Sequence, residues 1–224
     1  MPYGVPTQEL IQQANGAPPA CWAAFVALAQ DASSQALQAL LEAAHSRDPH
    51  IRRAAIEAIA SRQLSAAVTS AMIGALSDSD GAVVRAACHA ATTLAARDAH
   101  ERLVGLVASA DPLTREVALG ALRVLWDPGD FEVVFEVFRR DRSPTVRKKA
   151  AWTLRAHVTA ETWRPLFEAW RQDPLHRHRL WACEIAAKFG RAEIREYLSM
   201  LAEDQDGLVR RAATRALSAI AAAY

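Results

Sequence analysis

Six arginines recur along the chain at nearly constant intervals, and each lies in a similar apolar frame. Their successive separations are 33, 30, 32, 32 and 31 residues, and they are Arg52, Arg85, Arg115, Arg147, Arg179 and Arg210. Five of the six residues that precede them are β-branched, and the residues three positions after them are all small: Ala55, Cys88, Ala118, Ala150, Ala182 and Ala213. Self-similarity at a period of about 20 to 50 residues is the signature of a solenoid, so the chain is predicted to be a tandem array of short units.

Each arginine is expected to lie early in a helix. The small or apolar residues Ala150, Thr153, Leu154 and His157 follow Arg147 at intervals that place them on one helical face. A second series of helices is expected between the arginine-bearing ones, at Ser34–Ala44, Leu64–Leu76, Ala99–Ala108, Pro128–Arg139, Thr159–Arg171 and Arg191–Ala202. Each unit is therefore predicted to be a helical hairpin.

Turn signals precede the arginine-bearing helices. The pairs that place a capping oxygen before a proline suited to the first helical turn are Asp48-Pro49, Asp111-Pro112, Ser143-Pro144 and Asp173-Pro174. Asp80-Gly81 and Asp206-Gly207 are weaker versions of the same signal. These positions predict where the second helix of each hairpin begins.

A degenerate hairpin is expected at the start of the chain, with helices at Thr7–Ala14 and Pro18–Ala29 and with Cys21 in the place of the arginine. The fold class is therefore an all-α, right-handed α-solenoid of about seven helix pairs. At the other end, Leu217, Ile220 and Tyr224 form an apolar edge where a polar cap is expected. This edge is predicted to be covered by another subunit or by further sequence.

The frame Asp-Pro-x-Val-Arg-x-x-Ala resembles the HEAT repeat, and its period of about 31 residues is most similar to the phycobilisome-lyase type of HEAT-like repeat. Its best copies are residues 48–55 and 206–213. The resemblance covers about residues 17–220 and implies a single HEAT-like repeat domain over residues 1–224, with 1–31 as the degenerate unit and 32–224 as six repeats. Such repeats occur in bilin lyases, in assembly scaffolds and in other proteins, so the resemblance implies the fold and not the function.

Composition sets limits on location and on partners. The three cysteines, Cys21, Cys88 and Cys183, are far apart and lie in Ala-rich stretches, which argues against a disulfide framework or a zinc site and favours a reducing compartment. The chain begins without a basic and apolar leader and contains no run of 18 apolar residues, so a soluble, cytoplasmic protein with no membrane partner is expected. No cofactor or metal is expected.

The repeated arginines have a structural and a functional interpretation. An anion-binding stripe is the functional one. In HEAT-like families, however, the repeated arginine bonds carbonyls or the turn aspartate of adjacent units, and the strict phasing with small residues favours such a structural ladder. The six arginines are therefore predicted to stabilise the stack.

A binding face is expected on the second helices, as in HEAT proteins, whose second helices line the concave side. Residues one and eight positions after each arginine are predicted to be more exposed, and residues five positions after it vary in the same way. Lys148, Trp152 and Arg155 lie on one helical face and form a basic, aromatic spot. The predicted contact adds Arg123 on one side and Arg179, Trp181 and Glu184 on the other.

Basic residues are concentrated in one block of the chain. Residues 139–195 contain 14 basic and 6 acidic residues, together with Trp163, Trp170 and Trp181, whereas the formal net charge of the whole chain is +1. Lys and Arg neutralise phosphates while indole faces stack on bases, so nucleic acid is an alternative partner. Tryptophans at helical spacing are also typical of a core, and the near-neutral balance is not that of a dedicated nucleic-acid binder.

Evidence for catalysis is weak. HEAT-like alkylpurine DNA glycosylases would require a buried carboxylate beside aromatic residues, and Glu184 is the weak candidate. The iron-binding His-Glu pairs of the HEAT-like deoxyhypusine hydroxylases are represented here by His100-Glu101 alone, and His176 and His178 point apart on a helix. A bilin-lyase-like subunit is a further alternative that rests on repeat type. We therefore expect a non-catalytic scaffold that binds a protein or peptide, with an acidic segment, on its second-helix face.

Overall fold

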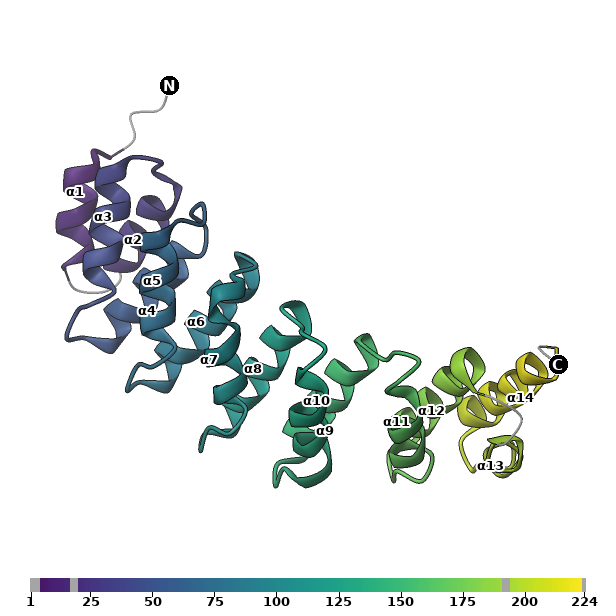
Figure 1. Ribbon diagram of the computed structural model, residues 1–224. Coiled ribbons are helices and arrows are strands. Elements are labelled where there is room, and N and C mark those ends of the chain that lie inside the picture. The colour runs from purple at the N-terminus through teal and green to yellow at the C-terminus, as the bar shows by residue number, and fades with distance from the viewer. Residues whose placement is uncertain (1–4, 17–19, 191–193, 223–224) are drawn as a thin grey trace. The chain divides into compact units, whose positions relative to one another are not determined.

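The computed structural model describes residues 5–16, 20–190 and 194–222, and the secondary structure of these residues is helical (Figure 1). The first helices of the hairpins are α1 (Thr7–Ala14), α3 (Ser34–Ala43), α5 (Ala66–Ala75), α7 (His100–Leu106), α9 (Asp130–Arg140), α11 (Trp163–Trp170) and α13 (Arg195–Leu201). The second helices are α2 (Ala20–Gln30), α4 (Pro49–Ile59), α6 (Gly81–Thr93), α8 (Pro112–Val124), α10 (Pro144–Ala156), α12 (His176–Phe189) and α14 (Gly207–Ala222). A short 3₁₀ turn, η1 (Arg97–Ala99), precedes α7. The described residues thus contain seven helix pairs, and the predicted α-solenoid class is confirmed.

The chain forms two compact units, Met1–Thr153 and Leu154–Tyr224, and the division falls within α10. In the first unit, α4 contacts α6 and α6 contacts α8 extensively, whereas α3 and α5 contact each other much less. In the second unit, α12 packs on α14 and also on α11. Successive second helices are therefore in closer contact than the first helices of the same hairpins.

Small residues make this close packing possible. The six residues that follow the repeated arginines by three positions have no exposed surface: Ala55, Cys88, Ala118, Ala150, Ala182 and Ala213. Because a methyl or thiol side chain allows two helix backbones to approach closely, larger residues fill the remaining space from the facing helices. The prediction that this column is buried is confirmed.

Capping explains where the second helices begin. The side chain of Asp48 accepts a hydrogen bond from the backbone N–H of His50 at 2.8 Å, and that of Asp111 accepts from the backbone N–H of Leu113 at 3.2 Å. Asp80 and Asp206 cap α6 and α14 in the same way. These side chains satisfy backbone donors that have no partner within the helix.

The predicted start of α12 at Asp173-Pro174 is wrong. This helix begins at His176, its N-cap residue is Leu175, and the Asp173 carboxylate accepts from the backbone N–H of Leu175 at 2.8 Å. Asp173 lies two residues before the N-cap, where Asp78 and Asp204 lie in their own repeats. The aspartate-proline pair thus marks the preceding turn in this repeat.

Other helix boundaries differ by a few residues. Helix α5 begins at Ala66 after the Ser65 cap and α11 begins at Trp163, whereas the sequence predicts starts at Leu64 and Thr159. The predicted starts at Pro18 and Arg191 lie outside the described residues. None of the described helices has the length and apolar character needed to cross a membrane.

Candidate functional site: the arginine ladder and the Trp152 cluster

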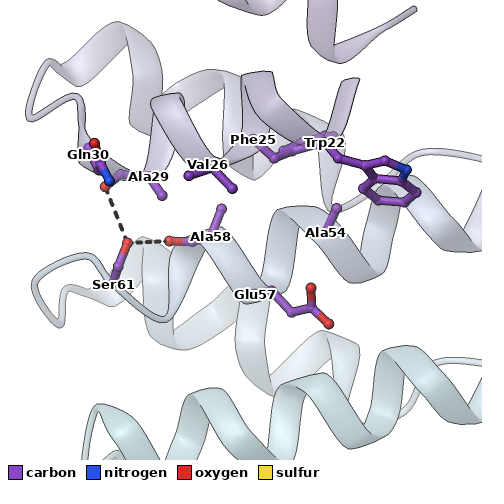
Figure 2. A pocket seen from close by; sticks show the side chains of 9 residues that line it. All are labelled: Trp22, Phe25, Val26, Ala29, Gln30, Ala54, Glu57, Ala58 and Ser61. Atoms are coloured by element: carbon purple, nitrogen blue, oxygen red, sulfur yellow. Dashed lines mark hydrogen bonds between the residues drawn. The ribbon is translucent and has the colours of Figure 1, made fainter. Parts of the chain in front are cut away.

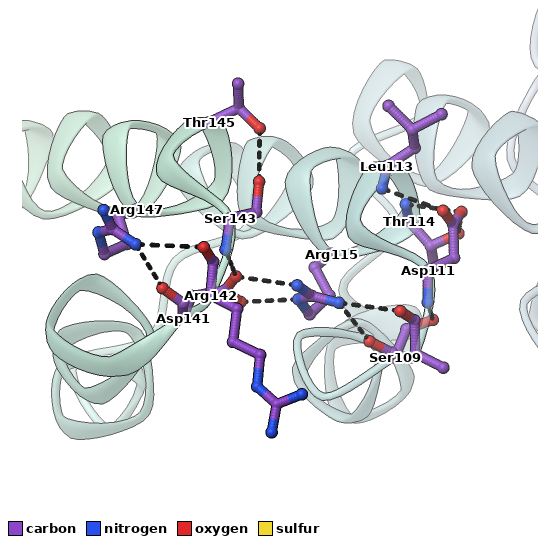
Figure 3. A network of polar contacts seen from close by, with 11 residues as sticks. Ser109, Asp111, Leu113, Thr114, Arg115, Asp141, Arg142, Ser143, Thr145 and Arg147 are labelled. Carbon is purple, nitrogen blue, oxygen red and sulfur yellow. Dashed lines mark hydrogen bonds and ion pairs between the residues drawn. The ribbon is translucent and has the colours of Figure 1, made fainter.

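Three of the repeated arginines, Arg52, Arg115 and Arg179, connect a second helix both to the loop before it and to the following repeat. Arg115 donates from Nε and Nη2 to the two carboxylate oxygens of Asp141 at 2.7 and 2.8 Å (Figure 3). Its Nη1 donates to the backbone carbonyls of Ser109 and Ala110 at 2.8 and 3.1 Å. Paired, charge-assisted hydrogen bonds of this kind fix the orientation of both partners. One guanidinium therefore holds two loops at once.

Two further arginines repeat this geometry. Arg52 makes the same two-pronged contact with Asp78 at 2.7 and 2.8 Å. Arg179 does so with Asp204 at 2.7 and 2.9 Å, and its side chain is 9% exposed. The partner aspartate lies two residues before an N-cap and also accepts from the N-cap backbone N–H, as in Asp78 with Asp80 and Asp204 with Asp206.

The remaining three arginines of the ladder differ in their hydrogen-bond partners. Arg85 donates from Nη1 to Asp111 Oδ2 at 2.7 Å, because the residue two positions before that N-cap is Ser109 and the capping aspartate supplies the carboxylate. Arg147 donates to the carbonyl of Asp141 at 2.6 Å, and Arg210 donates to the carbonyls of Asp204 and Gln205 at 2.7 and 3.0 Å.

Acidification provides a test of the ladder. Hydrogen bonds from the arginines hold the pKa values of Asp78, Asp141 and Asp204 below the ordinary value of 3.8. A lowered pKa contributes stability that is complete above the unfolded-state pKa and is lost as pH falls through the folded-state pKa. We expect the urea midpoint to be constant between about pH 7 and pH 5 and to fall below about pH 4. In Asp204→Asn the acid-side fall should be shallower, and an unchanged slope would contradict this assignment.

The first unit contains the exposed aromatic residue of the predicted contact. Trp152 in α10 is 38% exposed, and the Arg123 guanidinium from α8 lies 3.9 Å from its ring centroid. The Lys149 ammonium lies 4.5 Å from the same centroid, and Lys148 beside it is exposed. We call Arg123, Lys148, Lys149 and Trp152 the Trp152 cluster. Arg123 and Lys149 are close enough to the negatively polarised indole for cation–π interactions, while part of the ring stays accessible.

Gly120 makes room for this arrangement. A Cβ atom at Gly120 would lie 3.1 Å from Lys149 Cε and 3.3 Å from its Nζ, closer than ordinary van der Waals contact. The spacing of Lys149 and Trp152 on one helix was visible in the sequence. The proximity of Arg123 and Gly120 depends on how α8 and α10 pack, and the buried Thr153 hydroxyl, which donates to the Leu119 carbonyl at 3.0 Å, connects the same two helices.

The second unit contains the rest of the predicted contact. Arg155 donates to Glu184 Oε2 at 2.7 Å from Nη2 and at 3.2 Å from Nε, and its guanidinium lies 5.1 Å from the Trp181 ring centroid. Both side chains of the ion pair are 43% exposed. Arg179 and Trp181 are each 8% exposed, so they offer a partner little surface. The predicted contact therefore divides into a cationic cluster in one unit and an exposed ion pair over a mostly buried indole in the other.

The other tryptophans of the basic block lie in the core. Trp163 is 7% exposed and Trp170 is fully buried, where it meets Trp181 edge-on with ring centroids 5.7 Å apart. Their faces are not available to stack on bases. Several cations of the block are also paired with carboxylates, including Arg139 and Arg140 with Glu136.

The exposure pattern is less regular than predicted. Lys148, Arg155 and Arg211 are exposed as expected, whereas Ala86 is 6% exposed although it directly follows Arg85. Five positions after Arg85, Ala90 is completely buried, whereas Glu57 and Glu184 at the equivalent positions are exposed. Closely packed neighbouring helices cover part of this face.

The candidate catalytic and metal-binding residues lie in different environments. The Glu184 carboxylate is exposed and paired with Arg155, unlike the buried carboxylate that a glycosylase site requires. His178 is buried, with Nδ1 3.1 Å from Asp173 Oδ2. Among the residues that the structure describes, no three His, Cys, Asp or Glu side chains are placed to hold a metal ion. Burial raises the pKa values of Cys88 and Cys183 to about 12, which keeps both thiols protonated.

A groove between α2 and α4 was not predicted from the sequence. It has a volume of about 680 Å³ and is lined by Trp22, Phe25, Val26, Ala29, Gln30, Ala54, Glu57, Ala58 and Ser61 (Figure 2). Val26 is 62% exposed there, and Arg53 lies 5.9 Å from the Trp22 ring centroid. The repeat pattern did not reveal this groove, because the first hairpin has Cys21 in the place of the arginine.

The predicted apolar C-terminal edge is only partly present. Ile220 is 2% exposed, because it faces the interior of the last hairpin, and Leu217 is half-buried. Tyr224 lies outside the described residues. In the described part of this hairpin, the exposed large apolar residues are instead Met200 and Leu208, at 65% and 50%.

Comparison with protein families supports the assignment suggested by these hairpins. The model of the HEAT repeats matches residues 7–91, 69–155 and 163–223. The chain belongs to the HEAT repeat family. The arginine ladder is thus the internal frame of a HEAT repeat array. A search of curated proteins found no match.

Solved structures show the same HEAT-like fold. The complex of CpcE and CpcF of phycocyanin lyase from Nostoc sp. PCC7120 matches with a TM-score of 0.57 and 16% identity over 97% of this chain and 95% of that one. The archaeal HEAT-like repeats protein from Thermococcus onnurineus NA1 matches with a TM-score of 0.58 and 17% identity over 98% of both chains. A designed armadillo repeat protein in complex with the peptide (KR)4 matches with a TM-score of 0.50 and 18% identity, over 96% of this chain and 100% of that one. At these identities the likeness concerns the fold.

Proposed function

We propose that this HEAT repeat chain is a non-catalytic scaffold that binds a protein or peptide with an acidic segment at the Trp152 cluster. The observation that carries the proposal is a partly exposed tryptophan whose ring lies close to two cations, Arg123 and Lys149. Within the described residues, Lys148 and Lys149 form no ion pair with a carboxylate of the chain. The cluster therefore carries positive charge that an acidic partner would neutralise.

The composition of the cluster suits protein recognition. Tryptophan and arginine are enriched among the residues that contribute most to binding energy. An indole fixed by its neighbours loses little side-chain entropy on binding, because the cations already restrict its rotation. A glutamate or aspartate of the partner would contact Lys148 while an apolar residue packs on the exposed part of Trp152.

The position of the cluster on second helices also supports the proposal. Second helices of the first unit contact one another more closely than the first helices do, which is the packing expected on the inner side of a curved array. An inner surface presents several repeats to one extended partner. The designed armadillo protein bound to a peptide illustrates this use of a related fold in another protein.

Binding of acidic peptides by single-site variants tests the proposal. An array of acidic peptides that contain apolar residues identifies a ligand for the unmodified chain, and its affinity is then measured by fluorescence anisotropy. We expect Trp152→Ala to weaken binding at least about tenfold and Lys148→Glu to weaken it further. Trp22→Ala is the matched control, because this half-buried tryptophan also lies beneath an arginine but is far from the cluster in sequence.

The nucleic-acid alternative has a separate readout. Binding of labelled duplex and single-stranded DNA is measured at about 50 mM and about 200 mM salt, because phosphate contacts release counterions and lose affinity steeply over this range. We expect the chain to bind either form of DNA no more tightly than it binds the acidic peptide. Salt-sensitive DNA binding that is abolished by Trp152→Ala would instead identify the Trp152 cluster as a nucleic-acid-binding site. The bilin-lyase alternative is supported by likeness of fold alone.

A further inference from the structure

The groove between α2 and α4 continues beyond the cavity beside Trp22. That cavity shares Ala29, Gln30 and Ser61 with a second cavity of about 480 Å³, whose lining also includes Leu37, Arg62 and Leu64. The contact between α2 and α4 is less extensive than that between α4 and α6, which leaves this space open. The two cavities therefore form one continuous groove, which we call the α2–α4 groove.

The wall that α2 contributes is apolar and partly in water. Helix α2 contains no charged residue, although surface helices normally carry polar or charged residues on the face that meets water. Val26 is 62% exposed, and its side chain faces Ala58 of α4 across the groove (Figure 2). In the second cavity, Leu64 is 50% exposed. An apolar side chain of a partner would bury surface here that now meets water.

One carboxylate, that of Glu57, lines the groove and accepts no hydrogen bond from the residues that the structure describes. Its Oε1 lies 3.4 Å from Arg53 Nε, which itself has no hydrogen-bond partner in the described chain, and the Glu57 side chain is 57% exposed. Glu184, at the equivalent position of another repeat, instead accepts two hydrogen bonds from Arg155. Because an exposed ion pair without a hydrogen bond contributes little stability, Glu57 can accept from a partner's cation at little cost.

The cation that lines the groove is already engaged. Nη1 of Arg62 donates to the carbonyls of Leu28 and Asp31, and its Nη2 donates to the carbonyl of Ser33. Since both terminal nitrogens hold backbone carbonyls, Arg62 offers little to an acidic partner. The groove therefore favours a cation over an anion.

We propose that the α2–α4 groove binds a peptide segment of another protein that carries a large apolar side chain close to a lysine or arginine. The apolar side chain would pack between Val26 and Ala58, and the cation would donate to the Glu57 carboxylate. The Trp152 cluster has the opposite charge preference. This inference therefore goes beyond the proposed function and does not depend on it.

Selection from a random peptide library tests the inference. A library displayed on phage is panned on the complete chain and, in parallel, on Val26→Ser, whose fold is checked by circular dichroism. Because Val26 is largely exposed, this substitution should leave the fold intact. We expect the unmodified chain alone to enrich peptides in which a large apolar residue lies close to a lysine or arginine. The proposal is overturned if no such peptide is enriched, or if Val26→Ser enriches the same peptides.

Affinities then separate the apolar contact from the ionic one. An enriched peptide and a version with glutamine in place of its cation are measured by fluorescence anisotropy. We expect Val26→Ser to weaken both about tenfold, and Val133→Ser, which changes an exposed valine of α9, to weaken neither. Glu57→Gln should weaken the cationic peptide several-fold and leave the glutamine peptide unchanged, because a double-mutant cycle isolates the coupling between the two charges. Equal effects of Glu57→Gln on the two peptides would contradict the proposal.

Other occupants of the groove give different results. A second copy of the chain would produce a dimer in sedimentation velocity that Val26→Ser dissociates, and a lipid surface would produce binding to phosphatidylcholine vesicles that the same variant abolishes. Either result overturns the inference. Acidic peptides that are lost in Trp152→Ala but retained in Val26→Ser would support the proposed function instead, so the two proposals can fail separately.

Discussion

Arg179→Ala should lower the free energy of unfolding by about 3 kcal/mol, because it removes a charged hydrogen-bonding group from a mostly buried pair and leaves a carboxylate without its partner. Arg179 holds Asp204 through two hydrogen bonds and the carbonyls of Asp173 and Pro174 through two more. All of these contacts lie within the second unit. Urea denaturation followed by circular dichroism measures the effect.

Control variants distinguish the contribution of the Arg179–Asp204 contact to stability from a general effect of charge. Arg177→Ala, two residues away on the same helix, removes an exposed arginine and should change stability by less than about 0.5 kcal/mol. Arg179→Lys should recover only part of the loss, since an ammonium cannot reproduce the two-pronged contact. Asp204→Asn combined with Arg179→Ala should cost less than the sum of the single changes. Strict additivity would show that the two residues are not coupled.

Trp170→Ala should destabilise the chain by about 4 kcal/mol, because it leaves a large cavity in the core of the second unit. The indole is fully buried, and its neighbours include Trp181 and His178, with ring centroids 5.7 and 6.2 Å away. Trp152→Ala should cost less than about 1 kcal/mol in the same assay, since its ring is already partly in water. Equal losses for the two variants would mean that Trp152 is a core residue and would remove the basis for the proposed contact.

Most of the architecture was predictable from local spacing. Helix α1 has the predicted boundaries, α3 and α9 differ from prediction by one or two residues, and the small residues after the arginines are buried as expected. Capping aspartates and the 3.6-residue period act within a few residues of sequence, so they can be identified without a partner. The starts of α11 and α12 were predicted less well, because neither N-cap residue, Thr162 or Leu175, makes a side-chain capping hydrogen bond.

The candidate site was less predictable. The sequence placed Trp152, Trp163, Trp170 and Trp181 in one basic block, and the structure leaves Trp152 exposed while the others are mostly or fully buried. It also places Arg123 over the Trp152 ring, although the two residues lie on different helices. The groove beside Trp22 had no signal in the repeat pattern.

The sequence alone determined the period, the paired helices and the column of small residues, because these depend on intervals within one chain segment. The tertiary structure decided which arginines hold a carboxylate and which indole meets solvent. Those outcomes depend on the residue that a neighbouring helix or loop places opposite each side chain, about 25 to 35 positions away. Arg179 and Arg147 share one sequence frame, yet the first holds the Asp204 carboxylate and the second donates to the backbone carbonyls of Asp141 and Arg142. An identical local pattern thus makes different contacts in different repeats.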